Sequence, residues 1–216
     1  ATVSKSGQGN SDIFNTGLIL GYVTDSFYGL TLGATFQSNF SPFADDEAKN
    51  LYAKDEFGSG SVLSEAYVAY TLGKTTAKVG RQFISTPLVS GSGSRMIKQS
   101  FEGALLLNTD LPQTTLAAGY VSKYQSRTTA GMDNDSLMTT DSDVGSFEKA
   151  ADFAGAKYHT FDGAYTLLAI NKSITNLTLT GQYALVQEVA DTVDVDVYHA
   201  EANYVLPLSG FKLGFD

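Results

Sequence analysis

The stretch NLTLTGQYALV, residues 176–186, alternates apolar and polar side chains along its whole length. On an extended chain, one face carries Leu177, Leu179, Tyr183 and Leu185. The opposite face carries Thr178, Thr180, Gln182 and Ala184. A period of two residues over this length predicts a β-strand rather than a helix. The strand would have one apolar face and one uncharged polar face.

Similar runs flank a regular series of connections along the chain. Tight turns are predicted at residues 24–29, 72–75, 108–113, 171–176 and 207–210. Longer polar connections are predicted at residues 39–60, 85–98 and 125–151, with a briefer one at 187–196. Every second connection is therefore tight, which is typical of a transmembrane β-barrel with short periplasmic turns and long outer loops. A soluble β-sandwich mixes long and short connections, so the barrel is favoured.

The alternation predicts about ten antiparallel strands. Their expected ranges are 13–24, 28–38, 61–72, 75–84, 99–109, 113–124, 153–171, 175–186, 194–206 and 209–216. Barrels that enclose an aqueous channel have about 16–18 strands, and the last predicted strand ends without a partner. The predicted fold class is all-β, an antiparallel transmembrane β-barrel. We expect residues 1–216 to form a single domain that is incomplete at its C-terminal end and belongs to a larger, 16–18-stranded barrel.

Composition supports this fold class and limits the possible chemistry. The 13 Phe and 12 Tyr residues suit the aromatic girdles of a barrel, and the absence of cysteine excludes disulfides and thiolate metal sites. The net charge is -9, and the acidic residues concentrate in the predicted loops 41–56, 125–152 and 187–196. Acidic outer loops would suit a lipopolysaccharide surface, although solvated loops are often charged in any protein.

Residues 70–103 read YTLGKTTAKVGRQFISTPLVSGSGSRMIKQSFEG. The segments KVGRQ (78–82), TP (86–87) and SRMIKQSFEG (94–103) resemble the OprD-type outer-membrane porins, especially the branch found in Campylobacterota. Lys98 departs from the pattern, because the family commonly has proline there. The resemblance implies an N-terminal half of a barrel of about 18 strands. It also implies passive, substrate-selective diffusion through a channel that inward-folded loops narrow and basic side chains line.

Residues 66–101 contain five basic residues and no acidic residue. In a low-dielectric lumen, such a stripe would attract anions. We expect Arg95 and Lys98 to lie near the narrowest part of the channel, with Lys78 and Gln82 on the polar face of their strand. The alternative is that these bases are ordinary solvated charges.

Arg81 breaks the alternation of its strand. It falls in phase with Ala77, Val79 and Phe83, where an arginine facing lipid at mid-bilayer would cost about 2–4 kcal/mol. A bulge at Gly80 could turn Arg81 inward, or Arg81 could lie at the headgroup rim. Both possibilities are compatible with the sequence.

Glu65 and Glu102 fall on polar strand faces, as does Glu201. Opposite the bases, these carboxylates could set a transverse field across the channel. They could equally form salt bridges that stiffen its wall.

No constellation in the sequence indicates an enzyme, a metal or a cofactor. The only two histidines, His159 and His199, lie far apart in sequence, whereas a metal site needs three or four converging ligands. The expected function is an outer-membrane porin for small hydrophilic or anionic solutes, with no bound nucleic acid. Expected partners are outer-membrane lipid, lipopolysaccharide and small solutes or ions, and a homotrimer is one assembly we consider. The alternative is a surface-displayed or soluble β-sheet protein for adhesion or binding.

Overall fold

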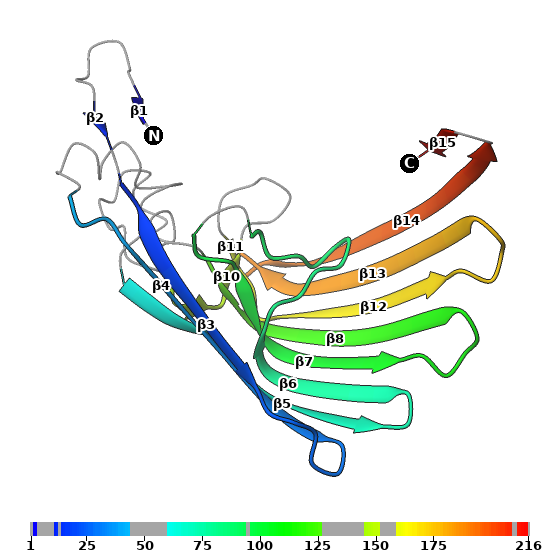
Figure 1. Cartoon of the computed structure of the whole chain (residues 1–216), viewed down its shortest axis with the longest axis horizontal. Helices are drawn as coiled ribbons and strands as arrows, with labels where there is room; N and C mark the ends of the chain where they lie inside the picture. Colours follow the sequence, from blue (N-terminus) through cyan, green and yellow to red (C-terminus); the bar gives the residue numbers. More distant parts are fainter. Residues whose placement is uncertain are drawn as a thin grey trace.

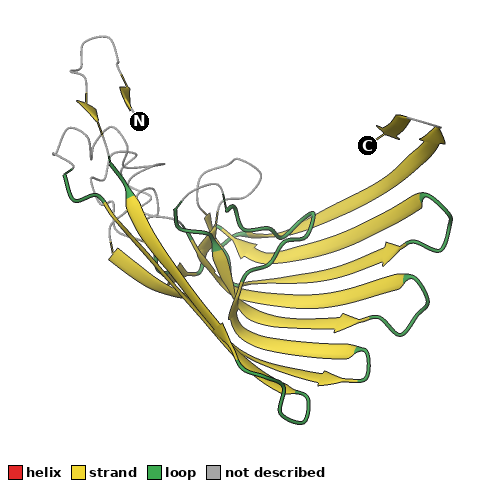
Figure 2. Ribbon diagram, in the orientation of Figure 1, coloured by secondary structure: helices red, strands yellow, loops and turns green. Residues whose placement is uncertain are grey.

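The computed structural model describes residues 2–3, 11–12, 14–43, 60–93, 96–126, 145–151, 159–208 and 211–215. These residues form strands, turns and loops (Figure 2). None of the described residues belongs to a helix long and apolar enough to cross a membrane.

One large antiparallel sheet dominates the described chain. Its strands, in spatial order, are β15 (Phe211–Phe215), β14 (Val193–Leu208), β13 (Leu177–Val189), β12 (Gly163–Asn171), β8 (Thr114–Gln125), β7 (Ser100–Asn108), β6 (Thr75–Gln82), β5 (Gly60–Leu72), β4 (Leu30–Phe40) and β3 (Thr16–Val23). A short strand, β9 (Phe147–Glu148), also pairs with β8. Figure 1 shows these strands as a curved trough, with β3 and β14 on opposite sides of the open space.

Four further short strands form two small sheets. They are β1 (Thr2–Val3) with β2 (Ser11–Asp12), and β10 (Ala150–Ala151) with β11 (His159–Thr160).

The ten predicted strands are confirmed in number, order and antiparallel pairing, with two errors at their ends. The strand predicted at 153–171 is β12, which begins only at Gly163, and residues 152–158 lie outside the described part. The polar connection predicted at 187–196 is wrong. There, Val189 of β13 pairs with Val193 of β14 around a tight turn. This turn is possible because Ala190 and Asp191 adopt positive φ angles of 54° and 56°.

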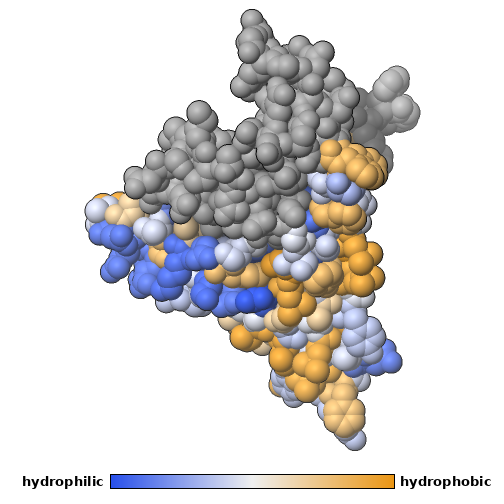
Figure 3. All heavy atoms as spheres, turned by 90° about the vertical axis from the view of Figure 1, so that its left-hand side faces the viewer, coloured by the Kyte–Doolittle hydropathy of each residue, from blue (hydrophilic) through white to orange (hydrophobic). Residues whose placement is uncertain are grey.

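The two faces of the sheet differ as the alternation predicts. In β13, Leu179 is 39% exposed, whereas Gln182 and Ala184 are each 4% exposed. Exposed apolar side chains continue across the same outer face on neighbouring strands, including Leu167 of β12 and Tyr198 of β14. Figure 3 shows hydrophobic residues gathered on one side of the molecule, away from a hydrophilic band. An apolar outer face is what a membrane-spanning sheet requires.

The sheet bends sharply near the long-loop ends of β5–β8. The register shifts at Ser64 between β4 and β5, and at Ser122 between β7 and β8. Ser64 of β5 lies 3.1 Å, Oγ to Oε1, from Gln125 of β8, although β6 and β7 separate these strands. Three strand spacings of a flat sheet would be about 14 Å. The two bulges therefore accompany a sharp bend of the sheet at these strand ends.

Candidate channel wall and its crossing segment

The connection between β6 and β7 forms a compact crossing segment, which we call the strap (residues 83–93 and 96–99). Its first part is a hairpin-like turn, because the Thr86 N–H donates to the Val89 carbonyl at 2.8 Å. Pro87 occupies the second position of this turn, which its fixed φ angle suits. The chain then folds back, and the Gly91 N–H donates to the Ile84 carbonyl at 3.1 Å.

One end of the strap is held by β13. The Leu88 N–H donates to Gln182 Oε1 at 2.9 Å, and Gln182 Nε2 donates to Thr86 Oγ1 at 2.9 Å. Gln182 Nε2 also lies 2.9 Å from Thr166 Oγ1 of β12, so the amide is fixed on both sides. The turn at Pro87 is therefore docked against the wall formed by β12 and β13.

The other end of the strap is held by β4. The Lys98 N–H donates to Gln37 Oε1, and Gln37 Nε2 donates to the Lys98 carbonyl, both at 2.9 Å. This side-chain amide pairs with the backbone as a neighbouring strand would. Close by, a Cβ on Gly17 of β3 would lie 2.9 Å from Met96 Cε. The strap therefore contacts β3 and β4 at one end and β13 at the other.

The spacing of these strands locates the strap on the concave side. Five strands separate β4 from β13 in the sheet, and six spacings amount to about 29 Å along a flat sheet. A strap that folds back on itself can join the two strands only if the sheet curves around it. The resemblance to OprD-type porins implies an inward-folded loop, and this geometry agrees with that expectation.

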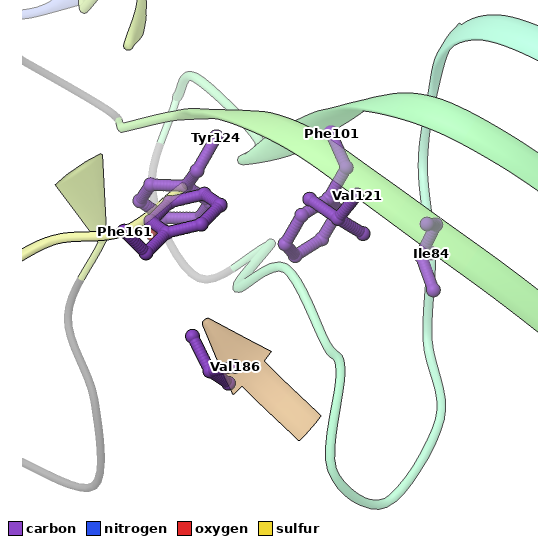
Figure 4. Close-up of a cluster of buried hydrophobic side chains, with 6 residues drawn as sticks. All are labelled: Ile84, Phe101, Val121, Tyr124, Phe161 and Val186. Atoms are coloured by element: carbon purple, nitrogen blue, oxygen red, sulfur yellow. The ribbon is translucent and has the colours of Figure 1, made fainter. Parts of the chain in front are cut away.

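Part of the strap packs in an apolar cluster. Its buried members are Ile84, Phe101, Val121, Tyr124, Phe161 and Val186, and Val89 of the strap packs against it. Figure 4 shows these side chains between β8, the end of β13 and the connecting loops. Burying Ile84 and Val89 gives the strap an apolar anchor between its two hydrogen-bonded ends.

Lys78 and Glu65 form the first charged group of the wall. Lys78 Nζ lies 3.6 Å from Glu65 Oε1 and 3.6 Å from the centroid of the Tyr67 ring. Glu65 also accepts hydrogen bonds from Thr35 Oγ1 at 2.7 Å and from the Phe83 N–H at 3.3 Å. Because Phe83 begins the strap, this carboxylate joins the wall to the crossing segment.

Arg81 and Glu102 form the second charged group. Arg81 Nε lies 3.3 Å from Glu102 Oε2, and the guanidinium lies 4.2 Å from the Phe147 ring centroid. Lys123 Nζ lies 3.9 Å from Glu102 Oε1. Gly80 has a φ of 121°, but β6 keeps its register with both neighbours there, so the bulge considered for Gly80 is absent. The Arg81 charge is instead compensated by a carboxylate and an aromatic ring.

The remaining predicted site residues differ in how much the structure shows of them. Lys98 is half-buried, with Nζ 4.2 Å from the Phe83 ring centroid, and within the described chain no carboxylate pairs with it. Gln82 is fully buried, and its Oε1 has no hydrogen-bond partner among the described residues. Arg95 lies outside the described residues.

Beyond the wall, one titratable pair lies in the connection between β8 and β12. Lys149 Nζ lies 2.6 Å from Asp162 Oδ1, and this hydrogen bond raises the pKa of the Lys149 ammonium. Both side chains are largely exposed, so the pair contributes little to stability.

Sequence reasoning missed the amide and hydroxyl groups that hold the wall together. Gln37 Nε2 donates to Ser64 Oγ at 2.5 Å, and Gln125 Oε1 accepts from Ser64 at 3.1 Å and from Ser100 at 2.9 Å. All four residues have 0% exposure. Their sequence signal is weak, since polar residues are expected throughout a lumen-facing strand phase. Their position near the long-loop ends of the strands could have drawn attention to them.

These features define a membrane-spanning antiparallel sheet that curves around an inward-folded strap. The family model "outer membrane porin, OprD family" matches residues 27–195, and the chain belongs to this family. Proteins of this family are outer-membrane channels rather than enzymes, so adhesion by a soluble β-protein is not favoured.

Three solved structures illustrate the similarity of fold. OccAB1 of Acinetobacter baumannii is 16% identical to this chain, with a TM-score of 0.69. The alignment covers 96% of this chain and 46% of the OccAB1 chain. OccK9 (OpdG) of Pseudomonas aeruginosa is 16% identical with a TM-score of 0.71, covering 98% and 52%. OpdK of Pseudomonas aeruginosa, solved with vanillate, is 14% identical with a TM-score of 0.70, covering 94% and 50%. The chain thus spans about half the length of these structures. No curated protein sequence matches it.

Proposed function

We propose that this chain forms part of the wall of a water-filled outer-membrane channel through which small hydrophilic or anionic solutes diffuse passively. Family membership over residues 27–195 carries the proposal. In this proposal, residues 1–216 belong to one β-barrel domain, which further strands complete to a closed wall. A closed barrel leaves no unpaired strand edge in lipid.

The charged groups beside the strap support passage of anions. Lys78 and Arg81 each have a carboxylate partner, whereas the Lys98 ammonium rests only on an aromatic ring among the described groups. An uncompensated positive charge in a narrow, low-dielectric passage raises the local anion concentration. We propose that Lys98, together with Arg95, supplies this charge. Vanillate, the compound solved with OpdK, is a carboxylate and is consistent with such a preference.

We further propose that the apolar outer face contacts outer-membrane lipid and that the acidic outer connections contact lipopolysaccharide through divalent cations. A homotrimer would bury part of the same outer face. Crosslinking of the detergent-extracted protein would distinguish a trimer from a monomer.

Recording from the full-length protein in planar lipid bilayers tests the proposed function. The protein should form open channels, and a salt gradient should give a reversal potential that favours anions. The double substitution of Arg95→Glu with Lys98→Glu should shift the reversal potential toward a preference for cations. The shift should be larger at low salt, because salt screens fixed charge. Failure of the wild-type protein to conduct ions would contradict the proposal.

A further inference from the structure

Two glutamines hold the strap from opposite walls, and neither is among the charged residues of the channel. We propose that Gln37 and Gln182 are positioning residues that clamp the strap across the lumen and thereby fix the channel's cross-section and the location of Lys98. This inference rests on the proposed function, because it concerns the passage that the strap would narrow.

The chemistry of the two contacts is the first argument for a clamp. Each glutamine uses both ends of its amide on the strap: Gln37 binds the N–H and carbonyl of Lys98, and Gln182 binds the Leu88 N–H and Thr86 Oγ1. A glutamine that only faced water in the channel would not bind the strap through both its carbonyl oxygen and its amide nitrogen. Both side chains are almost fully buried, at 0% and 4% exposure. Buried amides without partners would be destabilising, so the strap and the glutamines depend on each other.

The placement of the two contacts is the second argument. Gln37 and Gln182 stand on strands that five others separate, so the strap is fixed at both ends of its path across the concave side. Between these ends, Ile84 and Val89 pack on the apolar cluster. A segment held at two ends and in the middle has few alternative positions, whereas release of either end would leave a partly free loop in the passage.

The position of the Lys98 charge also depends on the clamp. Gln37 binds its main chain, while its ammonium group lies over the Phe83 ring. The clamp therefore sets where the Lys98 charge lies without neutralising that charge. Gln182 holds the opposite end, at the Pro87 turn, where the described strap carries no charged side chain. The two glutamines should consequently have different effects on ion selectivity.

The test compares single-channel recordings of the full-length protein with Gln37→Asn and with Gln182→Asn. Asparagine keeps the amide but withdraws it by about 1.5 Å, one C–C bond, which is beyond hydrogen-bonding reach of the strap. Thr31→Ser on β4 and Thr180→Ser on β13 are the matched controls. They lie in the same strand phases as the glutamines. Among the described residues, neither side chain forms a hydrogen bond to the strap.

Both asparagine variants should show excess open-channel noise. The population of channels in which one end of the strap is released should rise on the order of tenfold, because two hydrogen bonds to the strap are lost in each variant. Gln37→Asn should also lower the anion preference at low salt, because it frees Lys98, whereas Gln182→Asn should leave the reversal potential nearly unchanged. The two threonine controls should behave as wild type.

A second measurement covers variants that fail to assemble. The chain contains no cysteine, so Leu88→Cys combined with Gln182→Cys can be joined by a short, reducible thiol crosslinker. The crosslinked channel should show no excess open-channel noise. Reduction of the crosslink in the same channel should produce that noise. Equal noise before and after reduction, or wild-type noise and selectivity in both asparagine variants, would overturn the clamp. A wild-type protein without conductance would instead overturn the proposed function.

Discussion

Gly80 of β6 lies directly opposite Gly103 of β7, and neither position has room for a side chain. A Cβ on Gly103 would overlap the carbonyl oxygen of Tyr120, and a Cβ on Gly80 would overlap that of Ala66. Gly80 also has a φ of 121°, a conformation that other residues rarely adopt. The pair lets four strands, β5 to β8, approach closely at the place where the sheet bends.

We predict that Gly103→Ala lowers the free energy of unfolding by about 1–3 kcal/mol, because the added methyl group must displace backbone. Gly80→Ala should cost at least as much, since strain in φ adds to the overlap. Gly181→Ala is the control, because no atom lies within 4 Å of the Cβ it would add. Urea unfolding in lipid vesicles measures all three. Equal midpoints for Gly103→Ala and Gly181→Ala would contradict the prediction.

Single-cysteine labelling should distinguish the two faces of β13. With a membrane-impermeant thiol reagent, Thr180→Cys should react and Leu179→Cys should not, because position 180 shares the phase of Gln182 and position 179 faces lipid. The cysteine-free chain gives no background. Labelling of position 179 but not of position 180 would reverse the assignment of the faces.

Lys78 and Glu65 should affect ion selectivity in opposite directions. Glu65→Gln keeps an acceptor for the Phe83 N–H but leaves the Lys78 ammonium without its carboxylate, so the reversal potential should move toward anions. Lys78→Met should move it toward cations. Both shifts should fade at high salt, where fixed charges are screened. Glu201→Gln on β14, away from the strap, should shift the potential less; an equal shift would show that any loss of negative charge suffices.

Ser64 and Gln125 should be energetically coupled although β6 and β7 lie between their strands. In a double-mutant cycle of Ser64→Ala and Gln125→Ala, the unfolding free energies should deviate from additivity by about 1 kcal/mol. The control cycle combines Ser64→Ala with Thr178→Ala, which stands on the distant strand β13 and should be additive. Additivity in both cycles would mean that the sheet does not bend as described.

The period-two alternation was sufficient to predict the strands, because in a sheet the face that a residue occupies depends on its own position in the strand. Asp194 and Asp196 fell both in the predicted connection 187–196 and in the predicted strand 194–206, and only the strand is confirmed. In the structure both belong to β14, where Asp194 Oδ1 accepts the Glu188 N–H and Asp196 accepts a hydrogen bond from Tyr183 Oη. Carboxylates are tolerated in a strand when they are exposed and have such partners.

The candidate site was only partly predictable. Glu65 with Lys78 and Glu102 with Arg81 form salt bridges between neighbouring strands, which is the alternative that the sequence left open. Whether they set a transverse field stays a prediction. The roles of Gln37 and Gln182 could not be inferred, because their partners are 61 and 94 residues away and meet them only through the curvature of the sheet.

The clamp has a consequence for how such a channel can diversify. Gln37 and Gln182 bind main-chain groups of Lys98 and Leu88, and those groups are the same for every side chain except proline, which lacks the N–H. Substitutions at positions 88 and 98 can therefore alter the charge and width of the passage while the path of the strap is preserved. Solute preference can then change one residue at a time, both in natural variation and in a designed library, without a new barrel having to fold.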